Sequence, residues 1–335
     1  MNFAQERAYV GNLSQLFQIK EYRLAGGRQE GVRAVDICTG AGLELTVLPD
    51  RCMDLYQLKY AGKNLCYHTP SGIAAPAYYD KDGNEWLRSF FGGFLTTCGL
   101  TTTGTGTEDD GEVLGIHGRV GNLPADHFSV IVDEADGKPR VTLQGVMTEA
   151  VLFGNCLTLT RRIICTYGSN VIHMEDTVEN IGSRTAPNMM LYHFNMGYPL
   201  LSEKASYYIP TKKITPRDEF AAAHLDSWNR IDPPQPNFQE RCYYHDLETD
   251  AQGIAAVGVD NPAENLRVRI RFNKKELPYL VQWRMMGERE YVTGLEPANA
   301  PIEGRAAARA NGTLPFLKPG ERRSYHLSIE AGDCR

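Results

Sequence analysis

Two ionisable side chains with apolar neighbours are the strongest candidates for chemistry in this sequence. His193 lies in the strand-like segment LYHFNMGYP, and Glu296 lies between Leu295 and Pro297 in TGLEPANAP. Burial disfavours the charged form of each group, so it lowers the pKa of the imidazole and raises the pKa of the carboxyl into the range useful for general acid–base catalysis. A hydrogen-bonded core histidine and a turn carboxylate that caps backbone donors are the alternative interpretations.

Three other segments combine polar residues with glycine or proline: VLPDRCMDL (47–55), WLRSFFGGFLTTCGL (86–100) and IHGRVGNLP (116–124). Arg51 and Asp54 in the first segment are interpreted as a structural ion pair or as part of a binding site. Cys98 has no implied catalytic partner, so it is expected to be a buried structural thiol. The loop Thr101–Gly111 contains GTGT without the Gly-Lys-Ser/Thr ending of a phosphate loop. It is therefore expected to form a flexible rim of the site.

The elements that must position these residues have the pattern of β-strands. Apolar and polar residues alternate most clearly in Leu266–Phe272, where four apolar side chains share one face and three arginines share the other. Similar alternation recurs in Leu43–Val47 and Leu157–Ile163, while the clearest helix candidate is Arg217–Asn229. The pattern predicts an all-β, mainly antiparallel chain that forms one large two-sheet β-sandwich domain over residues 1–335.

Composition excludes several classes of protein. The formal net charge of -6 argues against a nucleic-acid partner, and the basic pairs Arg161-Arg162 and Arg322-Arg323 are expected on solvated strand faces. No segment approaches the roughly 20 apolar residues of a membrane-spanning helix, so no membrane association is expected. Eight cysteines without a CxxC motif and a start without a secretory signal indicate reduced thiols in a cytoplasmic protein.

Three motifs in this order carry a family resemblance: HGRVGNLP, LYHFNMGYP and TGLEPANAP. They resemble the histidine, histidine and glutamate motifs of the aldose 1-epimerase (galactose mutarotase-like) superfamily. With DRCMD and GGFLTTCGL added, the pattern is similar to a divergent branch of that superfamily, a domain family of unknown function (DUF4432). The resemblance spans roughly residues 40–330. It implies the galactose mutarotase-like supersandwich, a small-molecule sugar as partner, and no cofactor or metal.

The resemblance also implies a reaction and roles for residues. An aldose 1-epimerase opens a pyranose by removing the proton of the C1 hydroxyl while the ring oxygen is protonated, and then closes the ring on the other face. Glu296 would be the base and His193 the acid. His117 would be the second histidine, which binds the sugar and helps to orient or polarise the ring oxygen.

Further substrate-binding residues are implied less directly by the same resemblance. Arg88 lies where the family has an arginine, and Arg119 and Arg51 compete for that role. His245 or Asp246 would hold sugar hydroxyls, although the order of the two residues is reversed from the family's Asp-His segment. Aromatic side chains could stack on a sugar or pack in the core; they are Trp283, Trp86, Tyr192 and Phe194.

Three alternative functions remain open at this point. One is a carbohydrate-binding protein without catalysis, and another is epimerisation or isomerisation away from C1 through the same base. The third is a metal-dependent sugar isomerase that draws its ligands from His117, His127, His193, His245 and Glu296. The spacing of these residues contains no HxH or HxxxH, so each ligand would come from a different strand. A homodimer is also left open.

Overall fold

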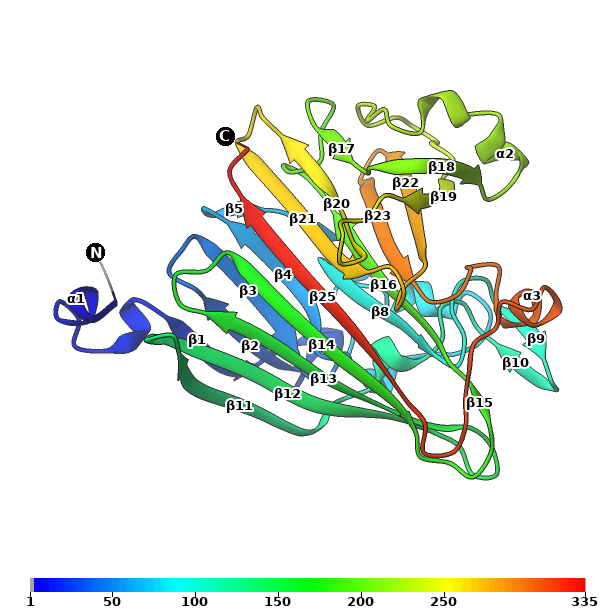
Figure 1. Ribbon diagram of the computed structural model, residues 1–335, viewed down its shortest axis with the longest axis horizontal. Helices are drawn as coiled ribbons and strands as arrows, with labels where there is room; N and C mark the ends of the chain where they lie inside the picture. Colours follow the sequence, from blue (N-terminus) through cyan, green and yellow to red (C-terminus); the bar gives the residue numbers. More distant parts are fainter. Residues whose placement is uncertain (1–2, 335) are drawn as a thin grey trace.

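The computed structural model describes residues 3–334 and consists largely of antiparallel β-strands (Figure 1). The largest sheet has eight strands, in the spatial order β11 (Asp126–Ala135), β12 (Lys138–Ala150), β13 (Cys156–Thr166), β14 (Val171–Asn180), β25 (Arg322–Gly332), β21 (Leu266–Asn273), β20 (Ile254–Asn261) and β17 (Ser206–Tyr208). All neighbouring strands in it are antiparallel. The mainly antiparallel all-β prediction is therefore confirmed.

A second large sheet has six strands, in the order β18 (Thr211–Pro216), β19 (Arg241–Leu247), β22 (Tyr279–Gly287), β23 (Glu290–Ala298), β16 (Met189–Met196) and β8 (Leu95–Leu100). A third sheet has the order β1 (Gln18–Arg23), β2 (Arg33–Cys38), β3 (Leu43–Leu48), β4 (Asp54–Tyr60) and β5 (Lys63–Asn64). Three short two-stranded ladders pair β6 (Tyr67–His68) with β7 (Gly92–Gly93), β9 (Thr107–Asp109) with β10 (Glu112–Leu114), and β15 (Ala186–Pro187) with β24 (Phe316–Leu317).

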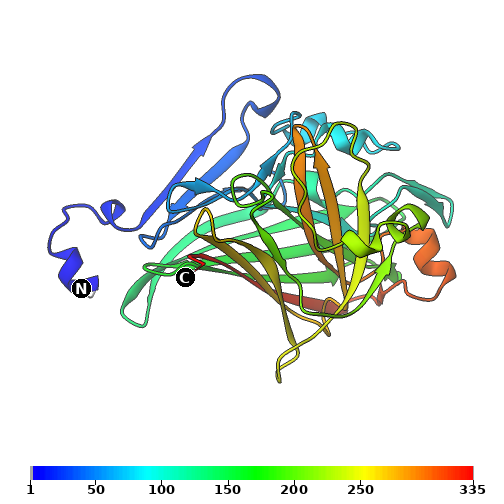
Figure 2. The same cartoon turned by 90° about the horizontal axis from the view of Figure 1, so that it is seen from above.

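The core lies between the sheets because alternate side chains of each strand face inward. On β16, Met190, Tyr192 and Phe194 are fully buried in one apolar cluster with residues of the eight-stranded sheet such as Leu143 and Ile329. The intervening residues of β16 point to the opposite face of the six-stranded sheet. Seen from above, the orange strands β22 and β23 run across the direction of the long green strands of the large sheet (Figure 2).

Helices are short and few in the described chain. The α-helices are α1 (Phe3–Arg7), α2 (Glu219–Ala222) and α3 (Arg305–Ala310). Single turns of 3-10 helix are η1 (Leu13–Gln15), η2 (Gly27–Gln29), η3 (Pro76–Tyr78), η4 (Glu85–Arg88), η5 (Val120–Asn122) and η6 (Leu225–Ser227). No helix within residues 3–334 is long and apolar enough to cross a membrane.

The helix predicted over Arg217–Asn229 is wrong in extent. Only α2 and η6 are helical there, and Arg217 still donates its backbone N–H to the carbonyl of Cys242 as a continuation of the strand pairing. The Asp218 carboxylate accepts from the Ala221 N–H and caps α2. The Ser227 hydroxyl donates to the His224 carbonyl, a local bond of the kind that competes with a continuing helix.

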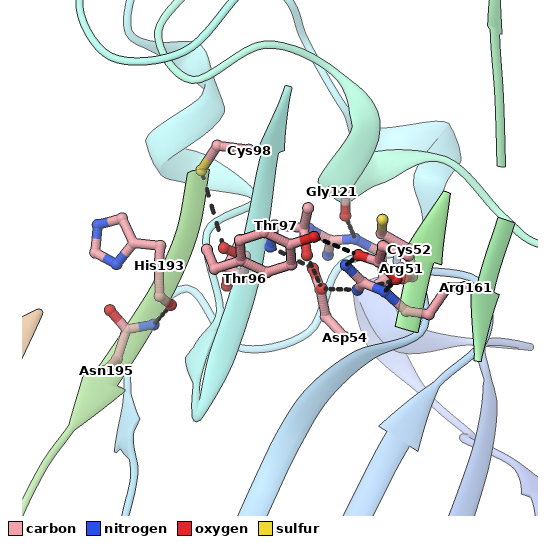
Figure 3. Close-up of polar contacts among 12 residues, drawn as sticks. Arg51, Cys52, Asp54, Thr96, Thr97, Cys98, Gly121, Arg161, His193 and Asn195 are labelled. Atoms are coloured by element: carbon pink, nitrogen blue, oxygen red, sulfur yellow. Dashed lines mark hydrogen bonds and ion pairs between the residues drawn. The ribbon is translucent and has the colours of Figure 1, made fainter. Parts of the chain in front are cut away.

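The prediction of a solvated face for Arg161-Arg162 is wrong for Arg161. Its guanidinium is fully buried and donates to both carboxylate oxygens of Asp176, at 2.9 and 2.7 Å, and to Asp54 Oδ1 at 2.8 Å (Figure 3). Arg161 shares the inward face of β13 with Leu159 and Ile163, so period-two alternation requires it to point inward. Arg162 faces outward as expected.

Arg51 and Asp54 do not form a direct ion pair. The buried Arg51 guanidinium donates to the backbone carbonyls of Gly121, Ala74 and Ser89, at 2.9, 2.8 and 2.9 Å. Asp54 instead bonds Arg161 and Thr97. Both residues are therefore structural, and they join segments that are distant in sequence.

Candidate active site

The register of two antiparallel strands brings His193 and Glu296 together. β16 pairs with β23 so that Leu191 faces Ala298 and Phe194 faces Leu295, which puts His193 opposite Glu296. His193 Nε2 lies 3.2 Å from Glu296 Oε1, and the two side chains are 7% and 3% exposed. Directly opposed residues on one face of a sheet are natural partners, although they are distant in sequence.

A glycine on β23 leaves room for the Glu296 carboxylate. Gly294 is on the same face, two residues before Glu296. A Cβ at Gly294 would lie 2.4 Å from Glu296 Oε1 and 3.1 Å from the Cβ of Trp283. The sequence motif TGLEP thus contains its glycine because a side chain would displace the carboxylate.

The pair is desolvated and incompletely hydrogen bonded. The pKa of Glu296 is raised to about 8, mainly by burial and also by the Glu240 carboxylate, while Arg217 opposes the rise. Burial lowers the pKa of His193 to about 4. Glu296 Oε1 is buried without a hydrogen-bond partner among the described residues. Buried polar atoms are normally satisfied, so an unsatisfied one marks a place for a polar ligand or water.

His117 reaches the same place from the loop that follows β10. Its ring centroid is 5.6 Å from that of His193, in an edge-to-face arrangement. Its Nδ1 accepts a hydrogen bond from the Gly104 N–H at 3.3 Å. The pKa of His117 is lowered to about 3, mainly by burial and also by the nearby His193. Both histidines are therefore neutral at physiological pH.

These three residues line a cavity of about 130 Å³ whose walls also include the aromatic side chains of Trp86, Phe90 and Trp283. Trp86 and Phe90 are stacked at 4.6 Å, and Trp283 lies edge-on to His193 at 5.3 Å. The full lining is Trp86, Leu87, Phe90, Gly104, Thr105, Ile116, His117, His193, Arg217, Glu240, Cys242, Trp283, Glu296 and Ile302. The loop Thr101–Gly111 therefore contributes to the rim through Gly104 and Thr105.

Three polar lining residues escaped the sequence analysis as site residues: Arg217, Glu240 and Cys242. Glu240 Oε2 accepts from the Trp283 indole N–H at 2.7 Å, and Arg217 Nη2 lies 3.7 Å from Glu240 Oε1. Arg217 Nη1 donates to the Cys242 thiol at 3.3 Å. Arg217 and Glu240 lie just outside β18 and β19, which are paired. The sequence does show a charged residue at the end of one strand and another at the start of the next. These two residues could have been predicted to lie together only if the pairing of β18 with β19 were known.

Several predicted binding residues do not line this cavity. Arg88 is 74% exposed in its side chain and pairs with Glu85, because its turn of helix directs Trp86 inward instead. Asp246 is exposed and paired with Lys274. Arg119 lines a separate cavity of about 100 Å³.

His245 is buried on the other face of β19 from the cavity. Its Nε2 lies 3.2 Å from Gln282 Oε1, and its ring packs against Trp228. Cys242 and Tyr244 occupy the face of β19 that leads to the cavity, so the period of two turns His245 away. Tyr192 and Phe194 likewise face the core. Trp283 and Trp86 do line the cavity.

No metal-binding group of three His, Cys, Asp or Glu side chains is present within residues 3–334. All eight cysteines of the chain lie in this range and none forms a disulfide.

Comparison of the sequence with known families places the chain. The family model described as "Domain of unknown function (DUF4432)" matches residues 29–331. The chain belongs to this family. No curated protein matches the sequence.

Solved structures with the same fold as this DUF4432 chain include aldose 1-epimerase-like proteins. A candidate aldose 1-epimerase from Klebsiella pneumoniae has a TM-score of 0.90 and 26% identity, over 96% of this chain and 86% of its own. A galactose mutarotase-like protein from Clostridium acetobutylicum has a TM-score of 0.68 and 15% identity, over 95% and 99%. Galactose 1-epimerase from Lactobacillus acidophilus has a TM-score of 0.62 and 14% identity, over 95% and 100%. The predicted galactose mutarotase-like sandwich is confirmed.

Proposed function

We propose that this chain is an aldose 1-epimerase, a mutarotase that interconverts the α and β anomers of a small-molecule sugar. The observation that carries the proposal is the 3.2 Å approach of His193 Nε2 to Glu296 Oε1 at the wall of an aromatic cavity. Anomer exchange needs only a base at the C1 hydroxyl and an acid at the ring oxygen. The fold shared with a galactose 1-epimerase is consistent with this reaction.

In the proposed reaction Glu296 takes the proton of the C1 hydroxyl while His193 donates a proton to the ring oxygen. The C1–O5 bond breaks and leaves an aldehyde at C1. Rotation about the C1–C2 bond presents the other face of the carbonyl, and both proton transfers reverse as the ring closes. His117 binds the sugar beside the ring oxygen.

The protonation state of the pair suits this chemistry. The pKa of Glu296 is raised to about 8 and that of His193 is lowered to about 4, both mainly by burial. Between these values the pair holds one proton, which rests on Glu296 before the sugar binds, so the proposed roles require that proton to move to His193. A sugar hydroxyl that donates to the Glu296 carboxylate favours its ionised form, and thereby moves the proton towards His193.

The remaining cavity walls supply the rest of a sugar site in this proposal. A pyranose has apolar C–H faces that pack against aromatic rings, here Trp86, Phe90 and Trp283. Its hydroxyls need polar partners, which Arg217 and Glu240 provide at one side of the cavity. Arg88, Asp246 and His245 are not part of this site.

A carbohydrate-binding protein without catalysis is the main alternative. Such a protein could pair the buried Glu296 Oε1 with a sugar hydroxyl. It would not need the imidazole of His193 3.2 Å from the same oxygen, whereas acid–base catalysis does. Epimerisation away from C1 would use the same acid–base pair, and a substrate panel separates it from mutarotation.

The test is anomeric-exchange NMR on hexoses, pentoses, deoxysugars and sugar acids, with and without the protein. We expect at least one sugar to exchange its anomers faster with the wild-type protein, and the Glu296→Gln variant to bind that sugar without accelerating exchange. If no sugar exchanges faster with the protein than without it, the assignment fails. Epimerised products without accelerated anomer exchange would move the chemistry away from C1.

A further inference from the structure

Gly104, on the rim of the cavity, makes two hydrogen bonds with His117, one with its ring and one with its backbone. The Gly104 N–H donates to His117 Nδ1 at 3.3 Å, and the Gly104 carbonyl accepts from the His117 backbone N–H at 2.8 Å. A neutral imidazole has one donor and one acceptor nitrogen. Since Nδ1 accepts, the proton must be on Nε2. His117 therefore offers the cavity a donor and not an acceptor.

The rim is held in turn by the segment that follows Glu296. The Thr105 N–H donates to the Ile302 carbonyl at 2.9 Å. A Cβ at Gly104 would lie 1.9 Å from the same carbonyl oxygen, and Gly104 has a φ of +74°. The rim and the Ile302 segment thus approach more closely than a side chain would allow.

A buried ion cluster fastens the β9–β10 hairpin to α3. The Asp109 carboxylate accepts from Arg305 Nε at 2.7 Å and from Arg309 Nε and Nη2 at 2.7 and 2.8 Å. Arg305 also donates to Glu112 on β10 at 2.9 Å. The Asp109 and Arg305 side chains are 4% and 2% exposed. Figure 1 shows the hairpin and α3 side by side at one end of the molecule.

We propose that this cluster is a clamp that keeps His117 in the Nε2–H tautomer, with Asp109 as its positioning residue. The clamp joins the β9–β10 hairpin, which follows the rim residues Gly104 and Thr105, to helix α3, which follows Ile302. Movement of either would shift the Gly104 N–H away from Nδ1. Without that donor the imidazole is free to take its proton at Nδ1 and to present an acceptor to the cavity. A group meant to bind a ring oxygen would then repel it.

The functional consequence rests on the proposed mutarotase activity, whereas the tautomer does not. The segment from Glu296 to α3 supplies the proposed base, Glu296, and also holds in place the Gly104 N–H that donates to His117. Displacement of a catalytic group by about 1 Å can cost on the order of 100-fold in rate, so a loosened clamp is expected to lower kcat/KM by about tenfold or more.

The experiment compares wild-type protein with Asp109→Asn and Arg309→Gln. Protein labelled with 15N at histidine gives long-range 1H–15N imidazole spectra, and a His117→Gln variant assigns the His117 signals. We expect a single Nε2–H tautomer in the wild type and a growing Nδ1–H population in Asp109→Asn. Arg309→Gln should give a smaller population, because Arg305 still holds Asp109. Asp133→Asn is the matched control, since Asp133 forms a comparable bidentate pair with Arg140 on the surface.

Two outcomes would overturn the clamp. One is a wild-type His117 protonated at Nδ1, and the other is an unchanged tautomer in both variants. Arg309 is 41% exposed in its side chain, so Arg309→Gln decides the matter if Asp109→Asn does not fold. A shift of tautomer in a protein that exchanges no sugar would support the clamp and count against the proposed function. An unchanged tautomer in an active enzyme would do the reverse.

Discussion

A buried polar cluster lies against each face of the six-stranded sheet, one contributed by β13, β14 and β4 and the other by β16 and β23, and the two clusters differ in how fully they are hydrogen bonded. On the core face, Arg161 is surrounded by Asp176, Asp54 and the Cys52 carbonyl, all within 2.9 Å. On the cavity face, Glu296 Oε1 lies near His193 and has no hydrogen-bond partner within residues 3–334. Figure 3 shows His193 on one side of β16 and β8 and the Arg161 cluster on the other.

This difference separates a structural cluster from a functional one. Complete pairing of buried charges fixes the surrounding strands, and removal of one partner leaves an uncompensated charge. Incomplete pairing leaves protonation to be set by the environment, which is the condition for acid–base chemistry. Burial alone does not distinguish the two, because both clusters are almost inaccessible to solvent.

The largest expected effect is on the cavity face. Glu296→Gln keeps the shape of the side chain but removes the base, so anomer exchange should fall by about 10²- to 10⁴-fold while folding is preserved. Anomeric-exchange NMR measures the rate, and titration of the sugar by the same spectra measures binding. Glu179→Gln, which removes a carboxylate on β14 that pairs with Arg322, should leave exchange unchanged.

On the core face, Asp176→Asn should destabilise the fold by about 3–5 kcal/mol, because the bidentate partner of a buried guanidinium loses its charge. Urea unfolding followed by circular dichroism measures the free energy. The adjacent Glu175→Gln is the matched control: Glu175 pairs with the exposed Arg162, so a change within about 1 kcal/mol is expected. Equal losses in the two variants would contradict the contrast between the clusters.

The pH dependence of stability should differ between wild type and Glu296→Gln. The pKa of Glu296 is raised from 4.5 to about 8 by folding, so its contribution is fully present below pH 4.5 and is lost as pH rises to 8. The variant lacks this loss, and its stability relative to wild type should grow from pH 5 to pH 8 by up to about 1.4 kcal/mol per unit. Parallel curves of unfolding free energy against pH would show that the carboxyl is not perturbed.

The smallest effect is expected from Gly294→Ala. The added methyl would meet the Glu296 carboxylate at 2.4 Å, so a destabilisation of about 1–3 kcal/mol and slower anomer exchange are expected. Gly287→Ala in the same hairpin comes nearest to the flexible end of Met285, at 3.1 Å, and makes ordinary contact with the Glu290 side chain, at 3.4 Å, so it should be tolerated. Thermal unfolding and the exchange assay compare the two. A tolerated Gly294→Ala with full activity would mean that Glu296 has room to move.

Much of the fold could be predicted from the alternation of apolar and polar residues in the sequence. Leu266–Phe272 was assigned its faces correctly, with the apolar residues buried and the arginines partly exposed. The same alternation in β13 places Arg161 on the inward face. The prediction of a solvated face followed the charge of the side chain instead, and it was wrong. The Arg217–Asn229 helix failed because capping and local side-chain bonds confine it to one turn.

The candidate site could be predicted in part. Glu296 and His193 were predicted from their apolar neighbours and from the motif resemblance, and His117 from the resemblance alone. All three line one cavity. Arg88, Asp246 and His245 were assigned by position in the sequence, and the geometry directs them elsewhere. Arg217 was assigned to the predicted helix Arg217–Asn229, and Glu240 lies outside that range. Both were missed as site residues because the pairing of β18 with β19 brings them together.

The sequence by itself determined which residues of each strand share a face, and hence that His193 and Glu296 would each be buried among apolar neighbours. Period-two geometry is a local property of the backbone, so it can be read without the fold. Only the tertiary structure decided that these faces meet, because the register between β16 and β23 joins residues 103 positions apart and is fixed by packing against the large sheet. Likewise, only the folded structure shows that Glu296 Oε1 has no hydrogen-bond partner within residues 3–334.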